Sequence, residues 1–311
     1  MNRRRQLTLA RLQQFTTLGA ATVAVLWATW AWRAGRPAWA LGGACLVMGG
    51  YVVVLALEFA LLRMKHGSDP TPRANLRQLC RAWWGEVRAA PAVFCWHQPF
   101  FSERRPDFLP QVLHPAPARR GVLLIHGFVC NRGLWNLWLR RLLEQQTPVV
   151  AVNLEPVFGS IDDYLQTVEQ AVLELEQCTG LAPVVVAHSM GGLVLRRWWA
   201  EQAGEGRIHH AITLGTPHQG TWLARFAFTR NARQMRQHSP WLQTLVAREL
   251  PQRRSRLTCF YSHCDNIVFP PQTATLPGAS NRHLPATAHV RMVDSDEPWL
   301  ELQRLLARDG A

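Results

Sequence analysis

One stretch in the second half of the chain limits its fold more than any other. Residues 184–193 read Val-Val-Val-Ala-His-Ser-Met-Gly-Gly-Leu, so a β-branched run ends at Ser189 and two glycines follow almost at once. Residues 193–203 then show the apolar spacing of a helix. β-Branched runs favour strands and a period of 3.6 residues favours helices. The stretch therefore predicts a strand, a sharp turn and a helix, with the serine at the turn.

A serine at such a turn suits nucleophilic catalysis. A hydroxyl is a weak nucleophile until a neighbouring base takes its proton, and a tight strand-to-helix turn lifts the oxygen clear of the sheet. The motif usually reads Gly-x-Ser-x-Gly; here Gly191 is in place, but Ala187 occupies the first glycine position. One extra methyl group is a mild departure. The alternative is a buried serine in an ordinary strand-to-helix turn.

The region around this turn alternates short apolar strands with helices. Strands are expected at residues 122–125, 149–152, 184–188, 211–214 and 257–261, and helices at 132–144, 161–177 and about 297–307. This alternation predicts an α/β fold with a mostly parallel sheet that is covered by helices on both faces.

Residues 1–66 predict a membrane hairpin. Residues 15–32 and 38–62 are each long and apolar enough to cross a bilayer, with Glu58 as their single charged residue. The loop at 33–37 is so short that the two spans must lie side by side. Tryptophans near this loop suit a membrane interface, and they are Trp27, Trp30, Trp32 and Trp39.

Flanking charges predict that both ends of this hairpin are cytoplasmic. The basic residues are Arg3, Arg4, Arg5 and Arg11 before the first span, Arg33 and Arg36 in the loop, and Arg63, Lys65 and Arg73 after the second. Positive charge concentrates on the cytoplasmic side of membrane proteins. The seven cysteines are scattered without a paired framework, which also suits a reducing compartment.

A signal peptide is the alternative interpretation of the first apolar segment. Residues 38–40 read Ala-Trp-Ala and resemble a cleavage site. The segment is long for a signal peptide, however, and Arg33 and Arg36 precede the supposed site. We therefore expect a two-span hairpin in the cell (inner) membrane.

A connector at 67–119 joins this hairpin to the region of alternating strands and helices. It is basic and contains proline and tryptophan. Its apolar spacing predicts a helix at 75–89, and its short apolar run at 92–96 predicts a first strand. No chemistry is assigned to the connector.

Four segments together carry a family resemblance. They are His126-Gly127-Phe128, Ala187-His-Ser-Met-Gly-Gly192, Thr213-Leu-Gly-Thr-Pro-His218 with Gly220-Thr221, and Asp265-Asn-Ile-Val-Phe-Pro270. This set resembles the triacylglycerol-lipase-like branch of the α/β-hydrolase superfamily, over 120–311 and not over the hairpin. The resemblance implies an α/β-hydrolase fold and a serine hydrolase, but it says little about the substrate.

The resemblance implies a Ser-His-Asp triad. Ser189 would be the nucleophile and Asp265, just after the strand at 257–261, the acid. His289 occupies the family's position for the base, before the last helix. His283 is the alternative base, although it suits a strand or loop better.

The resemblance also implies an oxyanion hole, which the backbone N–H groups of Phe128 and Met190 would form. His126 is expected to anchor the first of these loops through hydrogen bonds rather than to act in catalysis.

The insertion at about 222–256 interleaves large apolar residues with eight arginines. In this fold such an insertion lies above the active site, so it predicts a helical lid that rests on anionic lipid headgroups. The alternative is a well-packed helical cap with a solvated basic face.

Other function classes are disfavoured. The net charge of +13 would suit nucleic acid, but many of the arginines stand beside large apolar residues and next to a predicted membrane anchor. No glycine-rich phosphate loop or metal-spaced cluster is present, so no cofactor, metal or nucleic-acid partner is expected. The sequence predicts a membrane-anchored serine hydrolase that cleaves apolar or lipid esters through an acyl-enzyme. The alternative is a non-catalytic membrane-docked binding module that retains the fold.

A reporter fused after Ala311 tests the predicted topology. An enzyme reporter that works only in the cytoplasm should be active, and one that works only outside it should be silent, because the flanking charges hold both hairpin ends inside. The two fusions are compared in the same cells at equal expression. Activity of the outside reporter alone would contradict the topology and favour the signal peptide.

Overall fold

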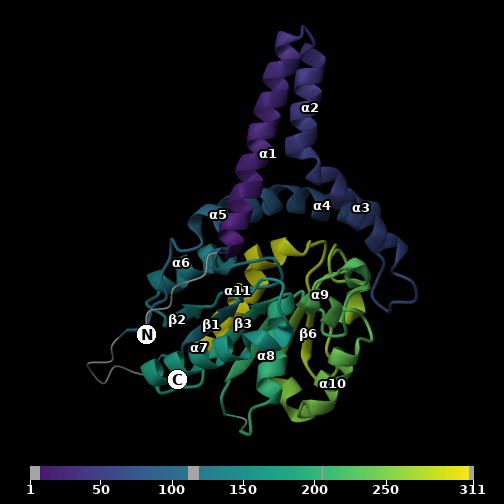
Figure 1. Cartoon of the computed structure of the whole chain (residues 1–311). Helices are drawn as coiled ribbons and strands as arrows, with labels where there is room; N and C mark the ends of the chain where they lie inside the picture. Colours follow the sequence, from purple (N-terminus) through teal and green to yellow (C-terminus); the bar gives the residue numbers. More distant parts are fainter. Residues whose placement is uncertain (1–7, 111–118, 205, 308–311) are drawn as a thin grey trace.

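A parallel sheet, helices on both of its faces and a helical stalk make up this computed structural model (Figure 1). It describes residues 8–110, 119–204 and 206–307. Arg3, Arg4 and Arg5, which entered the topology prediction, lie outside the described residues.

Six parallel strands form the sheet in the order β2-β1-β3-β4-β5-β6. Their bounds are Val122–Ile125 (β1), Val149–Ala151 (β2), Val184–His188 (β3), His210–Leu214 (β4), Leu257–Tyr261 (β5) and Ser280–His283 (β6). The sequence predicted the first five strands. It did not predict β6, because this exposed edge strand reads Ser-Asn-Arg-His and has no apolar pattern.

Alternate strand residues face two separate cores. On one face, Val185 and Ala187 pack with α7 (Leu165–Thr179) and α8 (Met190–Ala200). On the other, Val184 and Val186 pack with α6 (Asn136–Glu144) and α11 (Asp296–Ala307). Successive strand side chains point to opposite faces, so one β-branched run contributes to both cores. Their register brings the carboxyl ends of β3, β4 and β5 to one edge of the sheet.

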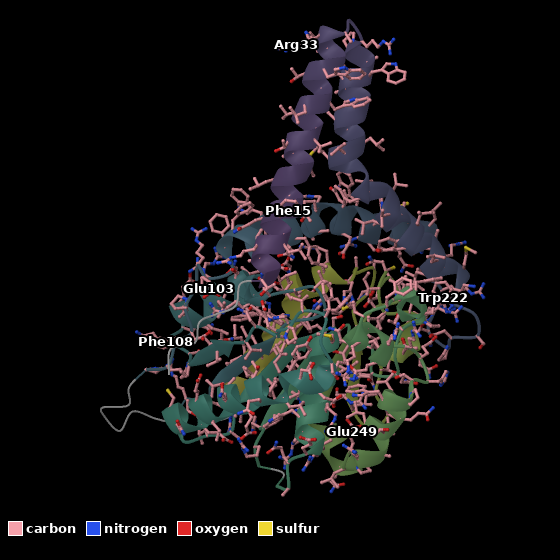
Figure 2. The ribbon with its side chains drawn as sticks, viewed as in Figure 1. Phe15, Arg33, Glu103, Phe108, Trp222 and Glu249 are labelled. Atoms are coloured by element: carbon pink, nitrogen blue, oxygen red, sulfur yellow. The ribbon has the colours of Figure 1, made fainter. Side chains whose placement is uncertain are left out.

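The first two helices form a stalk that projects from the domain (Figure 1). α1 (Thr8–Arg33) docks by its first turns, because Leu9 and Ala10 are buried and Gln13 Nε2 donates to Gln98 Oε1 at 2.8 Å. α2 (Pro37–Gly49) runs back beside it. Figure 2 shows Arg33 at the free end and Phe15 near the base.

The second predicted span is not one straight helix. The apolar run at 38–62 divides at Gly50 into α2 and α3 (Tyr51–Met64), with a bend of 50°. At 13 residues, α2 rises only about 20 Å, less than the ~30 Å of a hydrocarbon core. Among the described residues, α1 alone is by itself long and apolar enough to cross a membrane. The bend lets α3 leave the stalk and pack on the domain.

The connector is helical, so the strand predicted at 92–96 is wrong. α4 (Leu76–Pro91) agrees with the predicted helix, and it continues through a π-helical turn, η1 (Ala92–His97), into α5 (Gln98–Phe101). A five-residue apolar run does not by itself distinguish a strand from a buried helical turn. α3, α4 and α5 extend across the domain at the base of the stalk (Figure 1).

The insertion at 222–256 is a packed helical cap in this structure. Its helices are η4 (Trp222–Phe226), α9 (Arg230–Gln234), α10 (Pro240–Arg248) and η5 (Pro251–Arg256). Met235, Leu242 and Leu245 are buried in the same core as α8. Figure 2 shows Trp222 on the stalk side of the domain and Glu249 toward the opposite end. The insertion therefore extends along the flank, and its opening as a lid stays a prediction.

A buried ion pair fixes the cap to α8. Arg196 donates through Nε and Nη2 to the two carboxylate oxygens of Glu249 at 2.6 and 2.8 Å. The Arg196 side chain is 1% exposed and that of Glu249 is 10% exposed. Arg196 also donates to the His218 carbonyl at 2.9 Å. Hydrogen bonds in this bidentate geometry offset much of the hydration free energy that the two buried charges lose.

Glu249→Leu should destabilise the protein by about 3 kcal/mol or more, because the substitution leaves the Arg196 guanidinium buried without its counter-ion. Adding Arg196→Met should recover much of the loss, since it removes the fully buried guanidinium and leaves only the more exposed Arg254 without its contact to Glu249. Denaturant unfolding of the detergent-solubilised protein measures both. A loss below about 1 kcal/mol in the single variant would show that the cap is held loosely.

Candidate active site

Ser189 occupies a strained turn between β3 and α8. Its φ of 53° and ψ of −126° lie outside the usual regions for a residue other than glycine. A Cβ at Gly191 would lie 2.6 Å from the carbonyl oxygens of Ile125 and His126. A Cβ at Gly192 would lie 2.2 Å from Thr216 Oγ1. Close packing against backbone at Gly191 and against the Thr216 side chain at Gly192 leaves no room for a Cβ at either position, and the turn has the form of a nucleophile elbow.

Packing accommodates the alanine at position 187, where the motif usually has glycine. Its side chain is fully buried in the core beneath α7 and α8. The elbow itself is held by the end of β4, because Ser189 N donates to the Leu214 carbonyl at 2.8 Å. Thr216 Oγ1 donates to the Ser189 carbonyl at 2.9 Å. The extra methyl group thus fills core space and leaves the turn intact.

Asp265 and His289 form a buried acid–base pair. His289 Nδ1 lies 3.0 Å from each carboxylate oxygen of Asp265. Asp265 is fully buried, and its Oδ1 also accepts from the N–H groups of Ile267 and Val268 at 2.9 and 2.8 Å. With Nδ1–H donating to the carboxylate, Nε2 is the basic nitrogen of the neutral ring.

The electrostatics of this pair favour the protonated imidazole. Burial is the largest influence and lowers the pKa of His289, but the charge and hydrogen bond of Asp265, together with the charges of Glu86 and Glu58, outweigh it. The net pKa of His289 lies above its ordinary value of 6.5. An imidazolium at this position is therefore stabilised.

Ser189 lies next to the acid–base pair. His188, which precedes it in the sequence, contacts His289, and Gly215 lies against both members of the pair. The His188 ring packs on the His289 ring with centroids 4.6 Å apart, and His188 Nε2 lies 3.2 Å from the His289 carbonyl oxygen. A Cβ at Gly215 would lie 2.9 Å from Asp265 Oδ2 and 3.0 Å from His289 Nδ1. The described contacts include no direct Ser189–His289 hydrogen bond. Such bonds often form only once substrate is bound.

The two predicted oxyanion-hole residues flank the serine. A Cβ at Gly127 would lie 2.8 Å from Ser189 Cβ, so the loop before Phe128 approaches the nucleophile closely. Met190 is the first residue of α8, whose first amides have no partner within the helix. Met190 N–H thus lies at a helix N-terminus, which favours an anion, and Phe128 follows a glycine that closely approaches the serine.

His126 anchors the loop before Phe128, as expected. Its Nδ1 donates to the Gly127 carbonyl at 2.9 Å, and its Nε2 accepts from Leu154 N at 3.0 Å. Burial lowers the pKa of His126 to about 4, so the ring is neutral at physiological pH.

The alternative base is not part of the pair. His283 lies on β6, where its Nε2 is 2.5 Å from His263 Nδ1 and its ring packs on Tyr261. The structure therefore brings His289, and not His283, into contact with Asp265.

Sequence reasoning missed three side chains around His289. Asn266 Oδ1 accepts from His289 N at 3.2 Å, and Asn266 Nδ2 donates to Glu58 Oε2 at 2.7 Å. Glu86 Oε1 accepts from Val290 N at 3.1 Å. The sequence held two signals, Asn266 within the segment that carries the resemblance and Glu58 as a lone charge in an apolar run; nothing linked Glu86 to the site.

The N-terminal helices cover the acid–base side of the site. Phe59 and Leu62 of α3 and Leu79 and Ala82 of α4 pack against Cys264, Phe269 and Ala288. Ser189 is 7% exposed and His289 is 5% exposed. The site in this structure is therefore closed.

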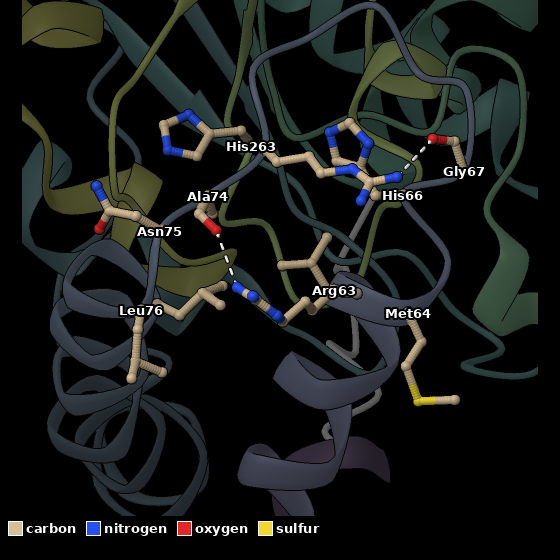
Figure 3. Close-up of a pocket in the computed structure, with 11 residues that line it drawn as sticks. Arg63, Met64, His66, Gly67, Ala74, Asn75, Leu76 and His263 are labelled. Atoms are coloured by element: carbon tan, nitrogen blue, oxygen red, sulfur yellow. Dashed lines mark hydrogen bonds between the residues drawn. The ribbon is translucent and has the colours of Figure 1, made fainter.

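Two surface cavities lie near this cover, and Ser189 lines neither. One, of about 700 Å³, lies between the end of α3 and the start of α4, with His66 and His263 on its wall (Figure 3). Figure 3 also shows Arg63 donating to the Ala74 carbonyl there. The other, of about 650 Å³, lies between α4 and the loop before His289. Within the described part of the chain, no group of three or more His, Cys, Asp or Glu residues could hold a metal ion.

A parallel sheet with a strained serine at the end of a central strand, beside a buried Asp–His pair, defines an α/β-hydrolase. The sequence matches the α/β hydrolase family over residues 122–310, more than half of the chain, and the chain belongs to this family. No curated protein sequence matches it.

Two lipases of known structure share the fold. The mature form of Bacillus licheniformis lipase BlEst2 superposes with a TM-score of 0.55 at 17% identity, over 64% of this chain and 96% of that one. Aspergillus fumigatus lipase B gives a TM-score of 0.52 at 16% identity, over 80% and 79%. At these identities the likeness shows the fold alone.

The acid limb of the pH profile for ester hydrolysis should have its midpoint above pH 6.5. A base must be neutral to take a proton, so activity rises as pH passes the raised pKa of His289. The measurement is kcat/KM for a p-nitrophenyl ester between pH 5 and 9. A flat acid limb, or a midpoint below 6, would contradict His289 as the base.

Proposed function

We propose that the protein is a membrane-anchored serine hydrolase of carboxylic esters, with apolar or lipid substrates. The supporting observation is the buried Asp265–His289 pair beside a serine whose backbone is held in a strained conformation. Strain of this kind costs about 1–3 kcal/mol, and it persists at sites where a function needs it. A binding module that only docked at the membrane would have no use for it.

The proposed reaction has two halves. Ser189 Oγ attacks the ester carbonyl while His289 Nε2 takes its proton, and the N–H groups of Phe128 and Met190 bind the developing oxyanion. Asp265 keeps the imidazole in its tautomer and stabilises the imidazolium. His289 then gives its proton to the leaving alkoxide, and an acyl-enzyme is left on Ser189. Water activated by His289 hydrolyses this ester and regenerates the serine.

Membrane anchoring is supported by the surface of the stalk. Large apolar side chains on it are exposed, among them Phe15, Leu18, Leu26, Trp30, Trp32, Trp39, Leu41 and Leu46. A contiguous exposed apolar surface of this kind suits lipid. Arg33 and Arg36 lie at the tip beside Trp32 and Trp39, so this end would rest in the headgroup region. Both ends of the stalk meet the domain, which agrees with a domain on one side of the membrane.

The proposed organisation keeps the domain bounds of 1–66, 67–119 and 120–311, with the hydrolase domain at the cytoplasmic face. Exposed apolar residues continue from the stalk onto α3, α4 and η1, and include Val53, Leu57, Leu76, Trp84 and Trp96. These helices would lie at headgroup level with the apolar stalk in the bilayer. Ester substrates dissolved in the membrane would then reach the domain on the side that carries α3 and α4.

Replacing Ser189 or His289 with alanine should each lower ester hydrolysis by roughly 10⁴-fold or more, and the double variant should lose little further, because the residues act as one unit. Labelling by a fluorophosphonate probe should be lost in Ser189→Ala. His283→Ala is the matched control and should keep near-normal turnover. Loss of activity in His283→Ala with normal turnover in His289→Ala would overturn the choice of base.

A further inference from the structure

Two carboxylates from the N-terminal helices reach the loops that hold the acid–base pair. Glu86 lies on the inner face of α4, is 2% exposed, and accepts from Val290 N through Oε1. Its Oε2 is buried with no hydrogen-bond partner among the described residues. Glu58 on α3 accepts from Asn266 Nδ2 at 2.7 Å.

These contacts converge on one short piece of backbone. The N–H of His289 donates to Asn266 Oδ1, which belongs to the side chain held by Glu58. The N–H of the next residue, Val290, donates to Glu86. Two consecutive amides at the proposed base are thus fixed by groups that depend on α3 and α4. Apolar packing of Phe59 and Leu79 in the same contact region holds these helices in place.

The position of Glu86 is costly for stability. Burial raises its pKa to about 7, and the Val290 N–H offsets only part of this increase. A leucine at this inward face of α4 would avoid the desolvation of a carboxylate. A carboxylate at this place therefore suggests a role besides packing. With a pKa of about 7, Glu86 is mostly ionised only above neutral pH, and there its negative charge faces an imidazole that becomes positive in the proposed reaction.

We propose that Glu86, and Glu58 through Asn266, are positioning residues for His289. The arm formed by helices α3 and α4 then completes the active site. This inference rests on the proposed function. In this arrangement α3 and α4, rather than the insertion at 222–256, are the elements whose placement governs the base. Docking of α3 and α4 on the domain is thereby coupled to the ability of His289 to act as the base. Substrate from the membrane enters beside these two helices.

The Glu86→Gln substitution removes the charge of the side chain and keeps its shape. The amide oxygen still accepts from Val290 N, but the negative charge is lost. The charged and titratable groups around Glu86 are Asp265 and His289 on the catalytic loops, Glu58 on α3 and Arg291, whose side chain lies over Gly85. Loss of a negative neighbour lowers the pKa of His289, so the acid limb of kcat/KM should move to lower pH, by no more than roughly half a unit because Glu86 is itself partly protonated over this range.

The full-length protein in lipid vesicles is the material for the test. With Glu86→Gln, kcat at pH 8.5, where Glu86 is ionised in the wild type, should fall about threefold, which is a half-unit pKa shift expressed as a ratio, while KM changes little. Glu86→Leu should lower kcat further because it also frees Val290 N, while its melting temperature should stay close to that of the wild type, since relief of the buried carboxylate offsets the loss of the Val290 hydrogen bond. Glu58→Gln keeps an acceptor for Asn266 and should have a smaller effect. Glu297→Gln, an exposed glutamate at the start of α11, is the matched control and should change neither kcat nor the acid limb.

An unshifted acid limb and unchanged kcat in Glu86→Gln, with an active wild type, would overturn the inference. Activity losses that follow only the melting temperature would also overturn it. Failure of the proposed function is distinguishable, because the wild type would then show no Ser189-dependent labelling. In that case the His289 ring is titrated by NMR in wild type and Glu86→Gln. A lowered His289 pKa in the variant supports the coupling between arm and histidine, and an equal pKa refutes it.

Discussion

The buried Asp265 carboxylate is the interaction on which the candidate site depends. It is fully removed from water, and it is tolerated there because two backbone N–H groups and the His289 ring donate to it. A buried carboxylate without such donors would take up a proton or unfold the loop. The same bond fixes the tautomer of His289 and favours its charged form. Acid, base and loop conformation are therefore set by one cluster of hydrogen bonds.

The parallel sheet brings this cluster to the serine. The carboxyl ends of β3, β4 and β5 lie at one edge, so the turn after β3 and the loop after β5 meet across the end of β4. Gly215 has no side chain, and a Cβ there would collide with both Asp265 and His289. Gly191 and Gly192 allow the equally close approach of α8 to β1 and Thr216. Small residues at three points thus let separate loops share a small space.

Helices α3 and α4 and the hydrolase domain are one packed unit at the candidate site. A hairpin that only tethered the domain would need no polar contact with the loops that carry Asn266 and His289. Here Glu58 and Glu86 bond to those loops, and the apolar residues around them exclude water. Low dielectric strengthens each of these bonds and also makes a broken one expensive. The bend at Gly50 is what turns α3 out of the stalk and onto the domain.

The sequence by itself determined the parts of the chain that follow local rules. The β-branched run before Ser189, the glycines after it and the alternation of strands and helices predicted five strands of the sheet and the elbow, because side-chain period and backbone sterics act over a few residues. The motif resemblance selected Asp265 and His289, which the fold brings together. Whether these residues catalyse stays a prediction.

Only the tertiary structure decided what depends on contacts between distant segments. The polar edge strand β6 forms because β5 offers a free edge, and the apolar run at 38–62 bends so that Phe59 and Leu62 of α3 pack on the domain. Glu86 and His289 are more than two hundred residues apart, and no local pattern records that one faces the other. Such long-range pairs are fixed by the packing of whole elements, which a one-dimensional pattern does not contain.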